Sequence, residues 1–256
     1  MSRPAKLVGL LFAGAALACA GAPTHSPTYG ARKAMAEELV HSADWPRAFS
    51  VVDGLYREDP TDVEVLSLRG SIYREQHLLK EAEADFDEAL RRNPKAAFAH
   101  SGLALVLELE GRGEEALDHH RRAAELDPKN AGYLNNLGFS LFAHGQAREA
   151  VPVFREALRL DPANPRLRNN LGFAYAKTGD FAQAAENFEL AGVPAEAKNN
   201  LGYAYQAARN FAQAFDLYVE ALRLDPGLSR ARQNLIQVAN RLGRPLPPDL
   251  AQEPRS

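Results

Sequence analysis

The sequence predicts an all-α solenoid of six helix–turn–helix units followed by one C-terminal capping helix. Three series of residues in one register predict it. Alanines recur at intervals of 34, 34, 34, 34 and 30 residues, namely Ala48, Ala82, Ala116, Ala150, Ala184 and Ala214. The same intervals separate a second series of small residues, Ala36, Gly70, Ala104, Gly138, Gly172 and Gly202, and prolines fall in this register at Pro60, Pro94, Pro128, Pro162 and Pro226. A fixed period of this length indicates stacked units rather than one globular core.

Composition is consistent with a folded chain and argues against one class of partner. The protein has 256 residues, of which 46% are hydrophobic, so a large apolar core can be buried. Its formal net charge is −3. A slightly acidic chain without a long basic run argues against nucleic acid as its main partner.

The N-terminus has the features of an export signal. Arg3 and Lys6 precede an apolar run at 7–18, LVGLLFAGAALA, which is too short to span a bilayer but suits a secretory signal peptide. Cys19, the only cysteine, follows directly and resembles the lipidated cysteine of a bacterial lipobox, with the flanking Leu and Ala in an atypical order. We therefore expect a signal peptide at 1–18, lipidation at Cys19 and a flexible tether at 19–28. The alternative is an ordinary signal peptide, cut after Ala18 or Ala20.

The repeat unit is clearest at 131–164. Two runs of apolar residues at helical spacing flank Gly145, and Asp161-Pro162 ends the second run. Proline stops the helix because it lacks an amide donor and restricts the residue before it. Gly138 and Ala150 are small where the two helices should cross most closely.

This unit resembles the tetratricopeptide repeat. The residues that carry the resemblance are Leu134, Leu137, Gly138, Leu141, Ala150, Phe154, Ala157 and Pro162. The resemblance covers 29–228 and implies a right-handed superhelix of six repeats, at 29–62, 63–96, 97–130, 131–164, 165–194 and 195–228. We expect 229–243 to form the capping helix and 244–256 to be a disordered tail.

The fifth repeat is four residues shorter than the others. Its second helix is expected to end at Ala191-Gly192, about one helical turn early. One interpretation is a tolerated deletion at a repeat boundary. The other is a changed superhelical twist that opens a notch for a partner.

The sequence contains no motif that indicates catalysis. Gly111-Arg112-Gly113 has the letters of a dinucleotide loop, but it lies at an inter-helix turn with no preceding strand. The seven histidines include no i, i+4 pair that would hold a metal. We therefore predict a non-enzymatic protein with no cofactor, no metal and no small-molecule substrate.

The resemblance places the first helix of each repeat along the concave groove of the solenoid. At the fifth and ninth places of these helices, which share one helical face, stand Leu105, Asn135, Phe139, Asn169, Phe173, Asn199 and Tyr203. Amides can pair with a peptide backbone and aromatics can bury its side chains, so we predict that these residues bind a peptide or helix of another protein. The alternative is that the amides and aromatics serve the scaffold itself. The Lys and Asn clamp with which some family members hold a C-terminal carboxylate is absent.

Six repeats behind a lipobox are similar in architecture to the pilotin-type lipoproteins. This similarity implies a scaffold on the periplasmic face of the outer membrane, lipid-anchored, that assists assembly of a pilus or secretin complex. A generic periplasmic adaptor for envelope or polysaccharide assembly, soluble or anchored, is the alternative, as is a non-catalytic subunit of an envelope enzyme.

Overall fold

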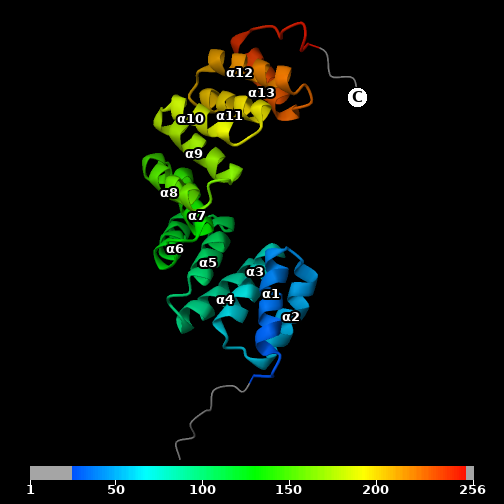
Figure 1. The fold of residues 1–256 in the computed structure, drawn as a ribbon, viewed down its shortest axis with the longest axis vertical. Helices are drawn as coiled ribbons and strands as arrows, with labels where there is room; N and C mark the ends of the chain where they lie inside the picture. The colour runs from blue at the N-terminus through cyan, green and yellow to red at the C-terminus, as the bar shows by residue number, and fades with distance from the viewer. Residues whose placement is uncertain (1–24, 252–256) are drawn as a thin grey trace, which may run out of the picture.

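The computed structural model describes residues 25–251, and within them it contains thirteen α-helices and no strand. Six helices are the first members of pairs: α1 (Tyr29–His41), α3 (Val63–Glu75), α5 (Ala97–Leu109), α7 (Ala131–Ala143), α9 (Pro165–Thr178) and α11 (Pro194–Ala207). Their partners are α2 (Trp45–Glu58), α4 (Leu79–Arg92), α6 (Gly113–Leu126), α8 (Ala147–Leu160), α10 (Phe181–Leu190) and α12 (Phe211–Leu224), and α13 (Ser229–Leu242) follows the last pair. The pairs stack into a curved rod (Figure 1), which confirms the predicted all-α solenoid.

The turn inside each pair has one residue in the left-handed region. That residue is Gly111, with φ 77°, in the third pair, and non-glycine residues such as His77, with φ 58°, occupy the same place elsewhere. Gly111 therefore serves the turn between α5 and α6, as the sequence predicts, because glycine adopts positive φ without a steric penalty.

In four of the six pairs, an aromatic side chain of the second helix packs on a glycine of the first helix. Phe154 of α8 lies so close to Gly138 of α7 that a Cβ built on the glycine would stand 2.7 Å from the ring. Gly70 with Phe86, Gly172 with Phe188 and Gly202 with Tyr218 repeat the arrangement. Gly138 is thus a point of close approach between the two helices, as predicted, and Ala150 is fully buried.

The fifth pair has the shortest helix. α10 spans 10 residues, whereas the second helices of the other pairs span 14. Gly192, with φ 109°, turns the chain directly into α11. The apolar side chains on either side of this turn, Leu190 and Val193, are exposed.

Both ends of the described chain pack more than the sequence predicts. Residues 25–28 belong to the expected flexible tether, but His25 stacks on Tyr29 and its Nε2 lies 2.9 Å from Asp59 Oδ2. The expected disordered tail also differs, because Leu250 is buried with Leu246 against α12 and α13, and Arg232 donates a hydrogen bond to the Leu250 carbonyl. Two leucines among the prolines give this segment enough apolar surface to cover the last helix pair.

The predicted signal peptide and Cys19 lie outside the described residues. Between residues 25 and 251, no helix combines the length and the apolar character needed to cross a bilayer.

Candidate protein-binding surface

The first helices place the predicted asparagines in a ladder that runs between repeats. Asn170 Nδ2 donates to Asn135 Oδ1 at 2.8 Å, Asn200 Nδ2 to Asn169 Oδ1 at 3.1 Å and Asn234 Nδ2 to Asn199 Oδ1 at 3.2 Å. Each bond joins the sixth place of one helix to the fifth place of the first helix before it.

This amide ladder changes how the predicted row of asparagines is interpreted. Asn135 and Asn199 are buried, and only Asn169 of the three is half-exposed. Their oxygens already accept hydrogen bonds within the protein, so the amides hold adjacent repeats in register. For these amides the structure agrees with the alternative considered from the sequence, in which they serve the scaffold itself.

The predicted aromatic residues divide into exposed and packed members. Phe139 is 51% exposed and Tyr203 is 53% exposed. Phe173 is half-buried, because its ring packs edge-on against Phe188 at 4.8 Å between centroids and against Tyr203 at 6.1 Å. Leu105, at the same place of α5, is also half-buried. Phe139 and Tyr203 are therefore the members of this row that offer apolar surface to a partner.

Two hollows lie beside Phe173 and Tyr203. One of about 280 Å³ is lined by Phe142, Phe173, Lys177 and Tyr203, together with alanines of α9 and α11. The other, of about 450 Å³, is lined by Phe173, Tyr203 and the asparagines at 169, 199, 200 and 234, with Glu196, Leu228 and Arg230. The C-terminal half of the first-helix face thus combines apolar, amide and charged groups.

A further hollow of about 380 Å³ lies at the short fifth repeat. Pro165, Arg166 and Asn169 of α9 form one side, and Phe188, Val193 and Glu196 are among the residues opposite. Asn169 borders both this hollow and the larger one at Tyr203. The missing turn of α10 is thus next to the predicted row.

The histidines of the third repeat belong to the scaffold. His120 is buried, with Nε2 3.2 Å from Glu108 Oε1. His119 Nδ1 lies 2.9 Å from His100 Nδ1, and burial lowers the pKa of both rings. Within residues 25–251, no three His, Cys, Asp or Glu side chains are grouped as metal ligands would be.

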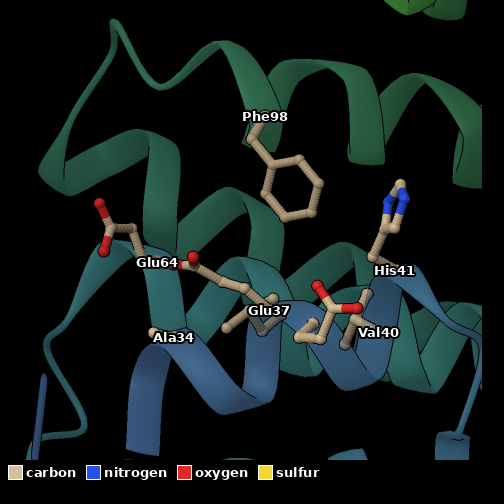
Figure 2. A pocket seen from close by; sticks show the side chains of 8 residues that line it. Ala34, Glu37, Val40, His41, Glu64 and Phe98 are labelled. Atoms are coloured by element: carbon tan, nitrogen blue, oxygen red, sulfur yellow. The ribbon is translucent and has the colours of Figure 1, made fainter. Parts of the chain in front are cut away.

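Sequence reasoning missed a hollow at the N-terminal end. This acidic hollow, of about 480 Å³, is lined by Ala34, Glu37, Glu38, Val40, His41, Glu64, Leu68 and Phe98. Figure 2 shows Phe98 projecting from α5 above Glu37 and His41 of α1, with Glu64 at one side. The available signal was the second place of the first helices, where Glu64 and Phe98 stand.

Comparison with known proteins agrees with this geometry. Three Tetratricopeptide repeat models match the chain, one at 34–97 and 67–131, one at 141–207 and one at 195–228. The chain belongs to the tetratricopeptide-repeat family. Repeats of this kind form scaffolds that bind proteins or peptides and are generally non-catalytic. No curated protein matches the chain.

Solved structures share the fold of this tetratricopeptide-repeat protein. PilF of Pseudomonas aeruginosa has a TM-score of 0.65 and 17% identity, over 82% of this chain and 97% of that one. YrrB, described as a TPR protein with an unusual peptide-binding site, has a TM-score of 0.60 and 22% identity, over 71% of this chain and 96% of that one. MamA has a TM-score of 0.52 and 21% identity, over 61% and 91% of the two chains.

Proposed function

We propose that this protein is a lipid-anchored scaffold of the bacterial cell envelope that captures a segment of a membrane-complex subunit on its first-helix face. The proposed location is the periplasmic face of the outer membrane, and the proposed client belongs to a pilus or secretin complex. The observation that carries the proposal is the pair of half-exposed aromatics on that face, Phe139 and Tyr203, of which Tyr203 lines two hollows.

The physical basis of client binding is burial of these rings. Large aromatic side chains dominate the energetics of protein interfaces when a partner excludes water from them. The amide ladder beneath them fixes the spacing of the helices, so the rings are held on a rigid support. A rigid support lowers the entropy lost on binding.

Two observations support the envelope setting. The basic start, the apolar run at 7–18 and Cys19 have the order of a lipoprotein signal. The fold is shared with PilF over nearly all of that chain. The competing function is a generic periplasmic adaptor, and mass spectrometry of proteins captured from solubilised envelope separates the two, because only the first requires secretin or pilus subunits.

The anchor is tested by Cys19→Ala. We expect the wild-type protein to fractionate with membranes and to carry a lipid mass, and the variant to be released, because acyl chains supply the membrane affinity. Membrane fractionation and intact-mass measurement check this. If the variant stays with membranes and the wild type carries no lipid, the anchor is rejected and the soluble alternative holds.

The binding face is tested by Phe139→Ala combined with Tyr203→Ala. We expect client affinity to fall about tenfold or more, since each truncation removes apolar area from the interface. Circular dichroism and thermal melting should change little, because both rings are half exposed in the free protein. Phe173 is unsuitable for this test because it packs on Phe188.

The matched control is Leu224→Ala. Leu224 is also exposed, but it lies on α12, a second helix. The control should bind the client as the wild type does. Equal loss in both variants, or no loss in the aromatic variant, would reject the first-helix face as the binding surface.

A further inference from the structure

The acidic hollow is built by three consecutive repeats. Residues of α1 form most of it, Glu64 and Leu68 of α3 add a second wall and Phe98 of α5 closes the third side. Figure 2 shows the Phe98 ring pointing toward the α1 residues rather than back into its own repeat. Like the hollows at Phe173 and Tyr203, it is lined by first helices, so it lies on the same face.

Helix α3 carries small side chains close in sequence to Leu68, which lines the hollow. At the places where later repeats have asparagine and an aromatic, α3 has Ser67 and Ser71. Both serines are buried, and their hydroxyls donate to carbonyls of their own helix, at Val63 and Ser67. These hydroxyls have their partners already, so they leave no unpaired polar group in this part of α3.

Apolar surface remains uncovered at this hollow. Phe98 is 42% exposed, Val40 is half-buried, and Leu68 lines the hollow although it is only 3% exposed. The Phe98 ring thus offers apolar area that a partner's side chain can cover.

The charged residues that line the hollow are mainly acidic. Glu37 and Glu38 are exposed, and among residues 25–251 neither forms an ion pair. Glu64 is partly neutralised by Lys33, which also binds Asp62 Oδ2 at 3.2 Å. Of the lining residues, only His41 can carry a positive charge.

We infer that the acidic hollow binds a protein segment in which a lysine or arginine stands next to a large apolar side chain. The apolar side chain packs on Phe98 and Val40, and the cation lies between the carboxylates of Glu37 and Glu38. The Phe98 ring adds a favourable contact with the cation. Acidic segments and anionic lipid surfaces are repelled by the same carboxylates.

This inference rests on the proposed function and specifies the client's chemistry at one end of the groove. The groove then has two unlike regions: an acidic N-terminal hollow and an aromatic and amide region at Phe139 to Tyr203. A client that spans both must place its basic residue at the N-terminal repeats, which fixes the direction in which it lies.

The test uses the purified protein and a phage library of random dodecapeptides. We expect selected peptides to be enriched in a basic residue adjacent to a large apolar one. For the best selected peptide, measured by fluorescence anisotropy, Glu37→Gln with Glu38→Gln should weaken binding about fivefold, because two exposed ion pairs are lost. Phe98→Ala should weaken it about tenfold, because apolar contact is lost.

The matched control is Glu81→Gln with Glu114→Gln. It changes net charge equally, but both glutamates are exposed on the second helices α4 and α6. The control should retain wild-type affinity for the selected peptide. Equal weakening in the control would show general charge attraction and overturn the inference. Selected peptides that lack basic residues, or a selection that enriches no peptide, would overturn it too.

The outcome can be separated from that of the proposed function. If the Glu37 and Glu38 variant and Phe98→Ala bind normally while the Phe139 and Tyr203 variant does not, the acidic hollow fails and the scaffold function stands. If none of these variants weakens any client, the proposed function fails as well. A second copy of this chain is the other possible occupant of the hollow, and sedimentation of the wild type tests it. If the wild type is a dimer and the Glu37→Gln, Glu38→Gln variant is a monomer, the second copy occupies the hollow and the inference is overturned.

Discussion

Replacing Asp85 with alanine is expected to lower the free energy of unfolding by about 3–5 kcal/mol. Arg69 of α3 donates from Nε to Asp85 Oδ2 and from Nη2 to Asp85 Oδ1, each at 2.6 Å. The side chains are only 14% and 8% exposed, and the guanidinium lies 3.3 Å from the Tyr56 ring centroid. Without Asp85, the guanidinium would remain buried with no counter-charge. The free energy of unfolding falls because a buried, unpaired charge is strongly destabilising.

Arg69 does not escape this penalty by losing its proton. Burial acts to lower the pKa of Arg69, but the hydrogen bonds and charge of Asp85 outweigh burial and raise that pKa above its ordinary value. Arginine keeps its charge in proteins even without such help. The variant must therefore either expose the guanidinium or hold it unpaired between the first two repeats.

Urea denaturation followed by circular dichroism measures the effect. Arg69→Met with Asp85→Leu should be close to wild type, because replacing both partners by apolar groups removes the desolvation penalty as well as the attraction. Glu156→Ala breaks the exposed pair with Arg159 and should lose less than about 1 kcal/mol. Equal losses for Asp85→Ala and Glu156→Ala would contradict the role assigned to the buried pair.

The fold was predictable because each repeat needs small and large residues at the same positions, where its two helices cross. Gly138 and Phe154 stand 16 positions apart, as do Gly172 and Phe188, and both pairs meet where the two helices of a repeat cross. A contact within one repeat has a fixed sequence spacing, so the period shows it directly. This is why the helix pairs and the short α10 could be read from the sequence.

Contacts between repeats were less accessible from the sequence. Asn135 and Asn136 are neighbours in the chain, but the ladder joins Asn135 to Asn170 of the next first helix. Which amide reaches which depends on how two repeats stack, and the spacing within a repeat does not report this. The same holds for the acidic hollow, because Glu37, Glu64 and Phe98 come from three repeats.

The described parts of the chain ends, 25–28 and 244–251, pack more than their composition indicates, for a different reason. Proline-rich polar composition favours disorder on average. Leu246 and Leu250 are few, but α12 and α13 offer an apolar surface on which both side chains pack. Burial of these two side chains there outweighs the composition of the segment, because removing apolar area from water is favourable.

Gly102→Ala is expected to destabilise the protein by about 2 kcal/mol, although alanine is the better helix former. A Cβ at Gly102 of α5 would stand 2.3 Å from Cε1 and Cζ of Phe86 in α4. Phe86 is fully buried and also packs against Gly70, so its ring has little room to move. Either the ring leaves its rotamer or α5 moves away from the second repeat, and each response loses packing.

Gly54→Ala is the matched control for this change. Gly54 lies inside α2, and a Cβ there meets only Arg32 Nη1, at 3.8 Å. The control should be stabilised by roughly 0.5–1 kcal/mol, because alanine restricts the unfolded chain more than glycine does. Phe86→Leu should be less harmful in the Gly102→Ala background than in the wild type, because the smaller side chain makes room for the new methyl. Urea midpoints of Gly102→Ala, Gly54→Ala, Phe86→Leu and the Gly102→Ala, Phe86→Leu double variant decide this. If Gly102→Ala is stabilised as much as Gly54→Ala, the space at Gly102 is not needed to stack the third repeat on the second.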